Sequence, residues 1–399
     1  MIRPLLRKLL SPVLTARDRW QLPSEAKSEI RKDRGGPPER DPGIDVCVRE
    51  AIDWIGRAQD ASLTHDGGVA RHYSLTKGWA PSYPETTGYI IPTLLDFARR
   101  TNSDEIRDRA KRMLDWCLKI QFPDGAFQGG IIGSQPVVPV TFNTGQILLG
   151  LAAGAREFGE PYLSAMVRAA DWLVRTQDPD GAWHRNSSPF ASPGTKAYDT
   201  HVAWALFEAA RVASETKYSE AGLANVRWAL SQQRDNGWFM NCCLSDYSIP
   251  LTHTLGYALR GLLEAHRYSN DASLLQAARK TADGLMSALR TDGGLPGCLA
   301  SDWSPATKWV CLTGAVQVAY CWLYLYQVTG EDRYREAAQK ANLFVRRTQD
   351  VTGRPEVRGA IKGSFPVDGE YGSLQYLNWA AKFFVDSNLY EKDLCMGRK

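Results

Sequence analysis

The amino-acid sequence predicts an all-α fold in which twelve helices form two concentric layers, an (α/α)6 toroid. Three observations predict this class. A glutamine recurs at a nearly constant spacing, each time directly before a turn. Apolar residues recur at helical spacing on both sides of these turns. Few segments alternate polar and apolar residues with a period of two, so no sizeable sheet is expected.

The repeat is long and covers most of the chain. The turns Gln-Phe-Pro-Asp-Gly-Ala-Phe, Gln-Asp-Pro-Asp-Gly-Ala-Trp and Gln-Arg-Asp-Asn-Gly-Trp begin at glutamines that are 56 residues apart. The next glutamine follows 116 residues later, which is two steps of 58, and a Thr-Asp-Gly-Gly sequence stands at the midpoint. Six copies therefore place their turns at Gln59, Gln121, Gln177, Gln233, Thr291 and Gln349. Such a period is typical of arrays of supersecondary units.

The third copy illustrates one unit. An amphipathic helix is predicted from Pro161 to Gln177, a loop rich in glycine and proline from Asp178 to Ala197, and a more apolar helix from about Asp199. Asp199 and Thr200 carry the short side-chain oxygens that cap helix N-termini. In the six copies, the second helices are predicted to begin near Glu85, Thr141, Asp199, Thr252, Thr313 and Ser373.

The arrangement of the helices follows from what each must bury. A single hairpin is too small to cover its own apolar face, so the six must share a core. The first helices are richer in charged residues and are predicted to form the outer layer, and the second helices the inner barrel. All six long loops then emerge at one end of the barrel. The alternative is an open superhelix of helix pairs, whose repeats are usually shorter and have short loops.

The string Gln177-x-x-x-Gly181-x-Trp183 resembles the repeat of squalene–hopene cyclases and of protein prenyltransferase β subunits. The other turns match it less completely, and the resemblance covers residues 44–390. It implies a toroid in which the glutamine caps a helix end and stacks on the aromatic ring, so it implies a structural role for the motif. The chain has neither the Asp-x-Asp-Asp motif of the triterpene cyclases nor an Asp-Asp-x-x-Asp cluster.

The two ends differ from the repeats. Residues 1–43 are basic and, towards their end, rich in proline and glycine, which predicts a disordered extension. Residues 1–14 are amphipathic, and a segment this short is expected to be a frayed terminus; weak peripheral contact with a membrane surface is the alternative. Residues 391–399 are expected to form a tail. No apolar run has the length of a signal peptide or a membrane span, which predicts a cytoplasmic protein.

Composition limits the partners. The 399 residues are 44% apolar and carry a net charge of +4, with the basic residues dispersed, so no nucleic-acid partner is predicted. The eight cysteines lie in predicted helices or near loops without a Cys-x-x-Cys pair, so neither a disulfide framework nor a metal site is predicted. No cofactor is predicted, and the sequence does not indicate an oligomeric state.

Polar residues that carry chemistry gather where the loops meet the inner helices. The catalytic candidates are Glu85, Asp199, His201, His253 and Tyr257. The substrate-binding candidates are Trp79, Tyr83, Asn143, Trp183, Trp238, Trp303, Glu370 and Tyr371. Each has a structural alternative: carboxylates cap helices, buried histidines occur in cores, and loop aromatics pack loops onto the barrel. The convergence of these side chains on one mouth favours a functional site.

These residues favour a carbohydrate-active enzyme. Paired carboxylates flanked by aromatic rings suit glycosidic hydrolysis, with Glu85 and either Asp199 or Glu370 as the pair. Arg71, Lys77, Arg185 and Lys196 in the loops suit an acidic polysaccharide or oligosaccharide. Three alternatives remain open: a uronate lyase or epimerase using His201, His253 or Tyr257, an isoprenoid enzyme as the repeat suggests, and a non-catalytic glycan-binding toroid.

Overall fold

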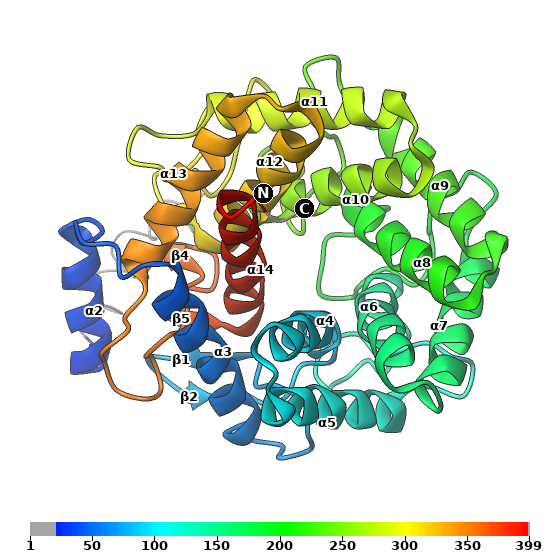
Figure 1. Ribbon diagram of the computed structural model, residues 1–399, viewed down its shortest axis with the longest axis horizontal. Helices are drawn as coiled ribbons and strands as arrows, with labels where there is room; N and C mark the ends of the chain where they lie inside the picture. The colour runs from blue at the N-terminus through cyan, green and yellow to red at the C-terminus, as the bar shows by residue number, and fades with distance from the viewer. Residues whose placement is uncertain (1–20, 398–399) are drawn as a thin grey trace, which may run out of the picture.

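The computed structural model, which describes residues 21–397, is a double ring of helices (Figure 1). The inner layer consists of α4 (Pro84–Thr101), α6 (Thr141–Phe158), α8 (Thr200–Ala213), α10 (Thr252–Ser269), α12 (Leu312–Thr329) and α14 (Asn378–Cys395). The outer layer consists of α3 (Ile44–Asp60), α5 (Asp104–Ile120), α7 (Tyr162–Thr176), α9 (Thr216–Leu230), α11 (Ala272–Ser287) and α13 (Asp332–Thr348). The predicted (α/α)6 toroid, with the charged helices outside, is confirmed.

The inner helices pack in chain order, and α14 packs against α4 to close the barrel. Each inner helix packs most closely with the outer helix that follows it, as α4 does with α5, and α14 takes α3 as its outer partner. Tight turns explain the pairing, because α4 and α5 are separated only by Asn102 and Ser103. Asn102 adopts a left-handed conformation that ends α4, and Ser103 caps α5. The long loops therefore lead from each outer helix to the next inner helix around the ring.

The strands are short and lie in the long loops. β1 (His72–Ser74) pairs with β2 (Gly78–Trp79) and with β5 (Gln375–Leu377), and β3 (Val310–Cys311) pairs with β4 (Ser364–Phe365). The β1–β5 pair joins the first loop to the sixth. Because β5 continues the extended chain to Leu377, α14 starts at Asn378 rather than near Ser373 as predicted. The other five inner helices begin within one residue of their predicted starts.

The recurring glutamine fastens each copy to the next. Gln177 Nε2 donates to the Gly181 carbonyl of its own turn and to the Ala221 carbonyl in α9, both at 2.9 Å. Gln121 makes the equivalent pair of bonds to Gly125 and Ala165, at 3.0 and 2.9 Å. The glycine of the turn is required because Gly181 has φ 90°, and a Cβ there would lie 2.4 Å from the Ala224 carbonyl oxygen. The motif is thus a seam between neighbouring outer helices, away from the centre.

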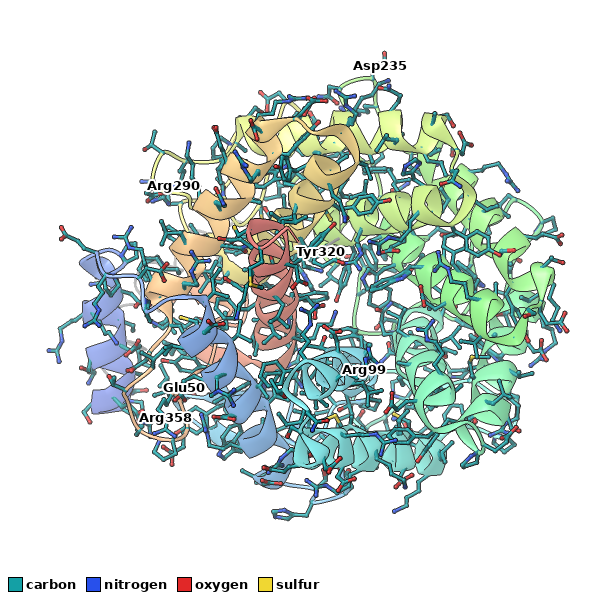
Figure 2. All side chains as sticks on the ribbon, viewed as in Figure 1. Glu50, Arg99, Asp235, Arg290, Tyr320 and Arg358 are labelled. Atoms are coloured by element: carbon teal, nitrogen blue, oxygen red, sulfur yellow. The ribbon has the colours of Figure 1, made fainter. Side chains whose placement is uncertain are left out.

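The sixth seam closes the ring. Gln349 Nε2 donates to the Gly359 carbonyl at 2.7 Å and to the Cys47 carbonyl in α3 at 3.1 Å. Beside it, Arg358 Nε donates to Glu50 at 3.0 Å, and these two side chains lie next to each other in Figure 2. The first and sixth copies are therefore held by the same device that joins the interior copies.

We expect Gln177→Ala to lower the free energy of unfolding by about 1–2 kcal/mol, because the Ala221 carbonyl loses a buried donor. The Gly181 carbonyl keeps its bond from Asn225, which limits the effect. Urea denaturation measures the change. The exposed Gln276 on α11 is the matched control, and Gln276→Ala should leave stability nearly unchanged. Loss of activity with unchanged stability in Gln177→Ala would contradict a structural role.

The N-terminal segment differs from our expectation. We predicted that residues 1–43 are a disordered extension, but α2 (Ser24–Arg34) is helical and docks on the sixth copy. Asp33, only 4% exposed, pairs with the buried Lys362 at 2.5 Å and accepts from the Val367 amide at 2.8 Å. Lys362 supplies the buried charge that orders this segment, and it is distant in the sequence. Residues 1–14, proposed for membrane contact, lie outside the described residues.

The C-terminal end also differs from our expectation. We predicted a tail from residue 391, but α14 continues to Cys395, and Glu391 is buried against Asn342 of α13 at 2.7 Å. Within the described part of the chain, no helix is long and apolar enough to cross a bilayer.

Candidate active site

A pocket of about 190 Å³ opens among the long loops. Its walls come from loop residues and from the first turns of inner helices, which is where the sequence placed the site. Six of the candidate residues line it, namely Tyr83, Glu85, Asn143, His253, Tyr257 and Tyr371. Further lining comes from residues that were not candidates: Thr86, Tyr89, Phe142, Ser188, Phe190, Ala191, Tyr198, Leu244, Thr254 and Trp379, together with Arg71.

Glu85 is the acidic group of this pocket. Pro84 begins α4 with a backbone angle that is already helical, which places Glu85 in the first turn. Burial raises the pKa of the Glu85 carboxyl to about 7, and the nearby Arg71 and Tyr83 hydroxyl oppose this rise only in part. Near neutral pH, Glu85 therefore exists in both protonation states and can donate or accept a proton.

Arg71 is the cationic group of the pocket. Its guanidinium lies between two rings, 5.2 Å from the centroid of Tyr83 and 5.3 Å from that of Trp379. No carboxylate of the described residues forms a salt bridge with it. Burial raises the pKa of the Tyr83 hydroxyl, and the nearby Asn143 opposes this rise, yet Asn143 Nδ2 makes no well-formed hydrogen bond with any described residue. Both side chains thus retain donors for a ligand.

The floor of the pocket is a group of rings that pack against one another at a tilt. The His253 ring lies 4.4 Å from that of Tyr257 and 5.4 Å from that of Tyr371. His253 Nδ1 is paired with Gln317 Oε1. Burial lowers the pKa of His253 to about 4, so its imidazole is neutral at pH 7. The Tyr257 hydroxyl donates to that of Tyr89 at 3.4 Å.

His201 lies beneath the pocket rather than in its wall. Its ring packs 4.5 Å from that of Tyr257, and its Nδ1 is paired with Gln146 Oε1 at 2.7 Å. Its Nε2 has no partner among the described residues and borders a cavity of about 10 Å³ beside Gln317, which is room for one water molecule. Of the two predicted histidines, only His253 reaches the pocket directly.

Two candidate acids do not reach the pocket. Asp199 is 7% exposed and lies in a short 3-10 turn, Ala197–Asp199, that precedes α8. Burial raises its pKa to about 7, against the effect of Lys196. That turn points Tyr198, and not Asp199, into the pocket. Glu370 is an exposed loop residue. The expected pair of carboxylates is therefore not assembled, and Glu85 is the one carboxylate in the wall formed by the described residues.

Four predicted tryptophans pack the loops instead of lining the pocket. Trp79 stacks 5.6 Å from Trp54 in α3. Trp183 Nε1 donates to the Leu173 carbonyl, and Trp238 and Trp303 are buried in the fourth and fifth loops. The repeat explains Trp183 and Trp238, because the aromatic residue of the motif follows the glycine that packs against the next outer helix, and its ring therefore faces the layer of helices.

Sequence reasoning missed several lining residues. Tyr89 and Trp379 had a usable signal, because each lies in the first two turns of an inner helix, like His253. Phe190 and Leu244 had none, since they lie in long loops whose path is set by tertiary contacts. No set of three or more His, Cys, Asp or Glu residues within 21–397 is grouped as a metal site would require.

Comparison with known proteins supports the architecture. The profile of the squalene–hopene cyclase C-terminal domain matches residues 80–260. No curated protein sequence shows significant similarity. Among solved structures, the unsaturated glucuronyl hydrolase of Bacillus sp. GL1, described as responsible for the degradation of glycosaminoglycan, superposes with a TM-score of 0.70 at 15% identity, covering 89% of this chain and 97% of that one.

Two further structures are similar in the same way. The cellobiose 2-epimerase of Bacillus thermoamylovorans has a TM-score of 0.69 at 11% identity, covering 86% of this chain and 98% of that one. A D-mannose isomerase has a TM-score of 0.69 at 12% identity, covering 90% and 99%. At such identities the similarity shows the fold, a six-hairpin α/α toroid, and not the activity.

Proposed function

We propose that this protein is a carbohydrate-active enzyme that hydrolyses an acidic oligosaccharide, with Glu85 as its proton donor. One observation carries the proposal: a carboxyl whose pKa is raised to about 7 faces a pocket that it shares with an arginine, and this arginine forms no salt bridge with a described carboxylate. The carboxyl supplies the proton at neutral pH, and the guanidinium supplies a counter-charge for an anionic sugar. Tyr83, Tyr371 and Trp379 offer ring faces and polar edges to sugar rings.

Because Glu85 is the one carboxylate in the described pocket wall, the geometry favours a hydrolysis that needs a single carboxyl group. Cleavage of a saturated glycoside needs two carboxyl groups, one on each side of the bond. An unsaturated uronyl group needs only one. Its C4–C5 double bond is an enol ether, so protonation at C4 by Glu85 lets water add at C5, and the resulting hemiketal opens and releases the attached alcohol. The Glu85 carboxylate takes up a proton from that water and is restored. The unsaturated glucuronyl hydrolases among the structural neighbours support this choice.

The test is turnover of oligosaccharides that carry an unsaturated uronyl end, as produced by polysaccharide lyases. Loss of the ultraviolet absorbance of the double bond, with release of a new saccharide, is expected. Elimination on intact acidic polysaccharides would instead create that absorbance. No turnover on a broad panel of acidic glycans, with cyclisation of an isoprenoid substrate, would overturn the carbohydrate assignment.

The pH dependence of the reaction should follow the ionisation of the Glu85 carboxyl group. Because the donor must be protonated, kcat/KM is expected to be constant below pH 7 and to fall about tenfold per unit above it. Arg71 lowers the pKa of Glu85, so Arg71→Met should move the fall in kcat/KM to higher pH. The same substitution should weaken binding of the acidic sugar. Rates of hydrolysis across pH 5–9 measure both effects. A rate that instead rises through pH 7 would assign Glu85 the role of a base.

One observation favours a second candidate, epimerisation. His253 is neutral at pH 7 and lines the pocket, so it could remove a proton from carbon. The epimerase and isomerase neighbours share the toroid. Incubation in heavy water separates the two candidates, because an epimerase returns sugar labelled at the inverted carbon without cleavage.

We also propose a cytoplasmic location. All eight cysteines are unpaired, and seven of them are buried, which suits a reducing compartment.

A further inference from the structure

We propose that the acidic sugar is linked to an apolar aglycone, which leaves the pocket across an apolar rim formed by the second, third and fourth long loops. The rim is defined as Ile132, Val137, Phe190, Met240 and Leu244. This inference rests on the proposed function and changes its substrate class from acidic oligosaccharides to glycosides in which the unsaturated uronyl group is linked directly to an alkyl alcohol.

The rim is a concentration of exposed apolar side chains. Phe190 is 58% exposed, Val137 49%, and Ile132, Met240 and Leu244 between 36% and 38%. Nine large apolar residues are exposed within 21–397, and five of them lie in these three loops. Single exposed apolar residues are common, but two of these five, Phe190 and Leu244, also line the pocket, and exposed apolar side chains at a pocket mark a binding surface.

Backbone hydrogen bonds hold the three loops together. The Thr141 amide donates to the Asn186 carbonyl at 2.9 Å, which joins the second loop to the third. The Ser192 amide donates to the Leu244 carbonyl at 2.8 Å, which joins the third to the fourth. The Phe190 ring lies against Gly130, where an added Cβ would come within 2.5 Å of the ring. Phe190 of the third loop thus touches the second loop at Gly130, and the third loop is bonded to the fourth at Leu244.

The pocket wall divides into two chemically different parts. Arg71, Glu85 and Asn143 form a polar part, contributed by the first two copies. Phe190, Ala191 and Leu244 form an apolar part, contributed by the third and fourth loops. An acidic sugar bound at the polar part must extend its leaving group along the apolar part.

The character of the rim favours an apolar chain over a second sugar. Sugar subsites combine aromatic faces with polar side chains that bond hydroxyl groups. The rim instead offers Ile, Val, Met and Leu side chains beside a single aromatic ring. Such side chains favour an apolar aglycone because they remove its surface from water. Each methylene of the aglycone that is buried should raise kcat/KM by up to about fourfold.

The experiment compares the methyl, butyl and octyl glycosides of unsaturated glucuronic acid. We expect kcat/KM to rise at least tenfold from methyl to octyl in the wild-type protein. Phe190→Ser and Leu244→Ser should abolish most of this gain, measured within each variant as the ratio of kcat/KM for the octyl glycoside to that for the methyl glycoside. Phe190→Leu should keep the gain. Val328→Ser, which alters an equally exposed apolar residue on α12, is the matched control and should change nothing.

The outcomes distinguish this inference from the proposed function. If the methyl glycoside is hydrolysed but chain length has no effect, the aglycone inference fails and the function stands. If Phe190→Leu loses activity on disaccharides while Phe190→Trp improves it, the rim stacks a sugar and the inference also fails. If no glycoside is hydrolysed, the proposed function fails. Calorimetric binding of the same three glycosides then decides the inference, which requires tighter binding of the octyl form.

Discussion

Replacing Glu85 with glutamine is expected to lower kcat about 10²–10⁴-fold, with little change in KM, because the amide keeps the shape of the side chain but cannot donate the proton. Glu85 is the carboxyl group in the described wall of the pocket, so no neighbouring acid there can replace it. Steady-state rates on an unsaturated uronyl oligosaccharide measure the loss. The residual activity should also lose the fall above pH 7 that wild-type protein shows, since Glu85 causes that limb.

Asp199 supplies the matched control. It is also a buried carboxyl with a pKa of about 7, but it does not line the pocket. Asp199→Asn should therefore leave kcat within about threefold of wild type. The opposite result, in which Asp199→Asn abolishes turnover and Glu85→Gln does not, would mean that the acid acts from outside this pocket.

Asp33→Ala is expected to lower the free energy of unfolding by about 3–5 kcal/mol, the effect of removing one partner from a buried ion pair. Lys362, which is 2% exposed, would keep only its contact with Glu29, at 2.6 Å. The Val367 amide would lose its acceptor as well. Denaturation by urea measures the loss of stability. The exposed Arg31 on the same helix is the control, and Arg31→Ala should cost less than about 0.5 kcal/mol.

A smaller loss has a specific structural meaning. If α2 detaches, Lys362 becomes hydrated, and the measured cost is then the docking free energy of α2. Proteolysis should cut Asp33→Ala between residues 21 and 43 faster than wild type in that case. Unchanged stability together with unchanged proteolysis would contradict the docked position of α2.

The toroid was predictable because it depends on features that repeat. Each copy supplies the glutamine, the glycine that packs against the next helix, and an apolar second helix, so errors in one copy are corrected by the others. Thr291 replaces the glutamine in the fifth copy, but the glycine is kept. A Cβ added to Gly293 would lie 2.3 Å from the Lys340 carbonyl oxygen, so this turn packs against the next outer helix like the others. The docked α2 was not predictable, because it belongs to no repeat and depends on Lys362, a lysine far along the chain.

The site was predictable only where it follows the repeat. Glu85 and His253 are the second residues of α4 and α10, Tyr257 lies one turn further along α10, and the ring brings them together. The prediction for Asp199 was wrong because a 3-10 turn directs its side chain away from the pocket, and the helical spacing of apolar residues does not indicate such a turn. The prediction that the four tryptophans bind substrate was wrong because aromatic content alone does not distinguish a ring that packs a loop from a ring that binds a ligand. Phe190 and Leu244 depend on contacts between loops, which spacing along the chain does not encode.

The bond from Gln349 to Cys47 means that this array of repeats has no end copies. In a linear array, the terminal units have one neighbour each, and they can fray while the rest stays folded. Here α3 packs against α14, and Gln349 at the end of α13 donates to the Cys47 carbonyl in α3. Unfolding must therefore open the ring before any copy can fray, and only then do the two copies beside the break have one neighbour each. Hydrogen exchange should accordingly show one protected unit that opens together, rather than a gradient that weakens towards the two ends.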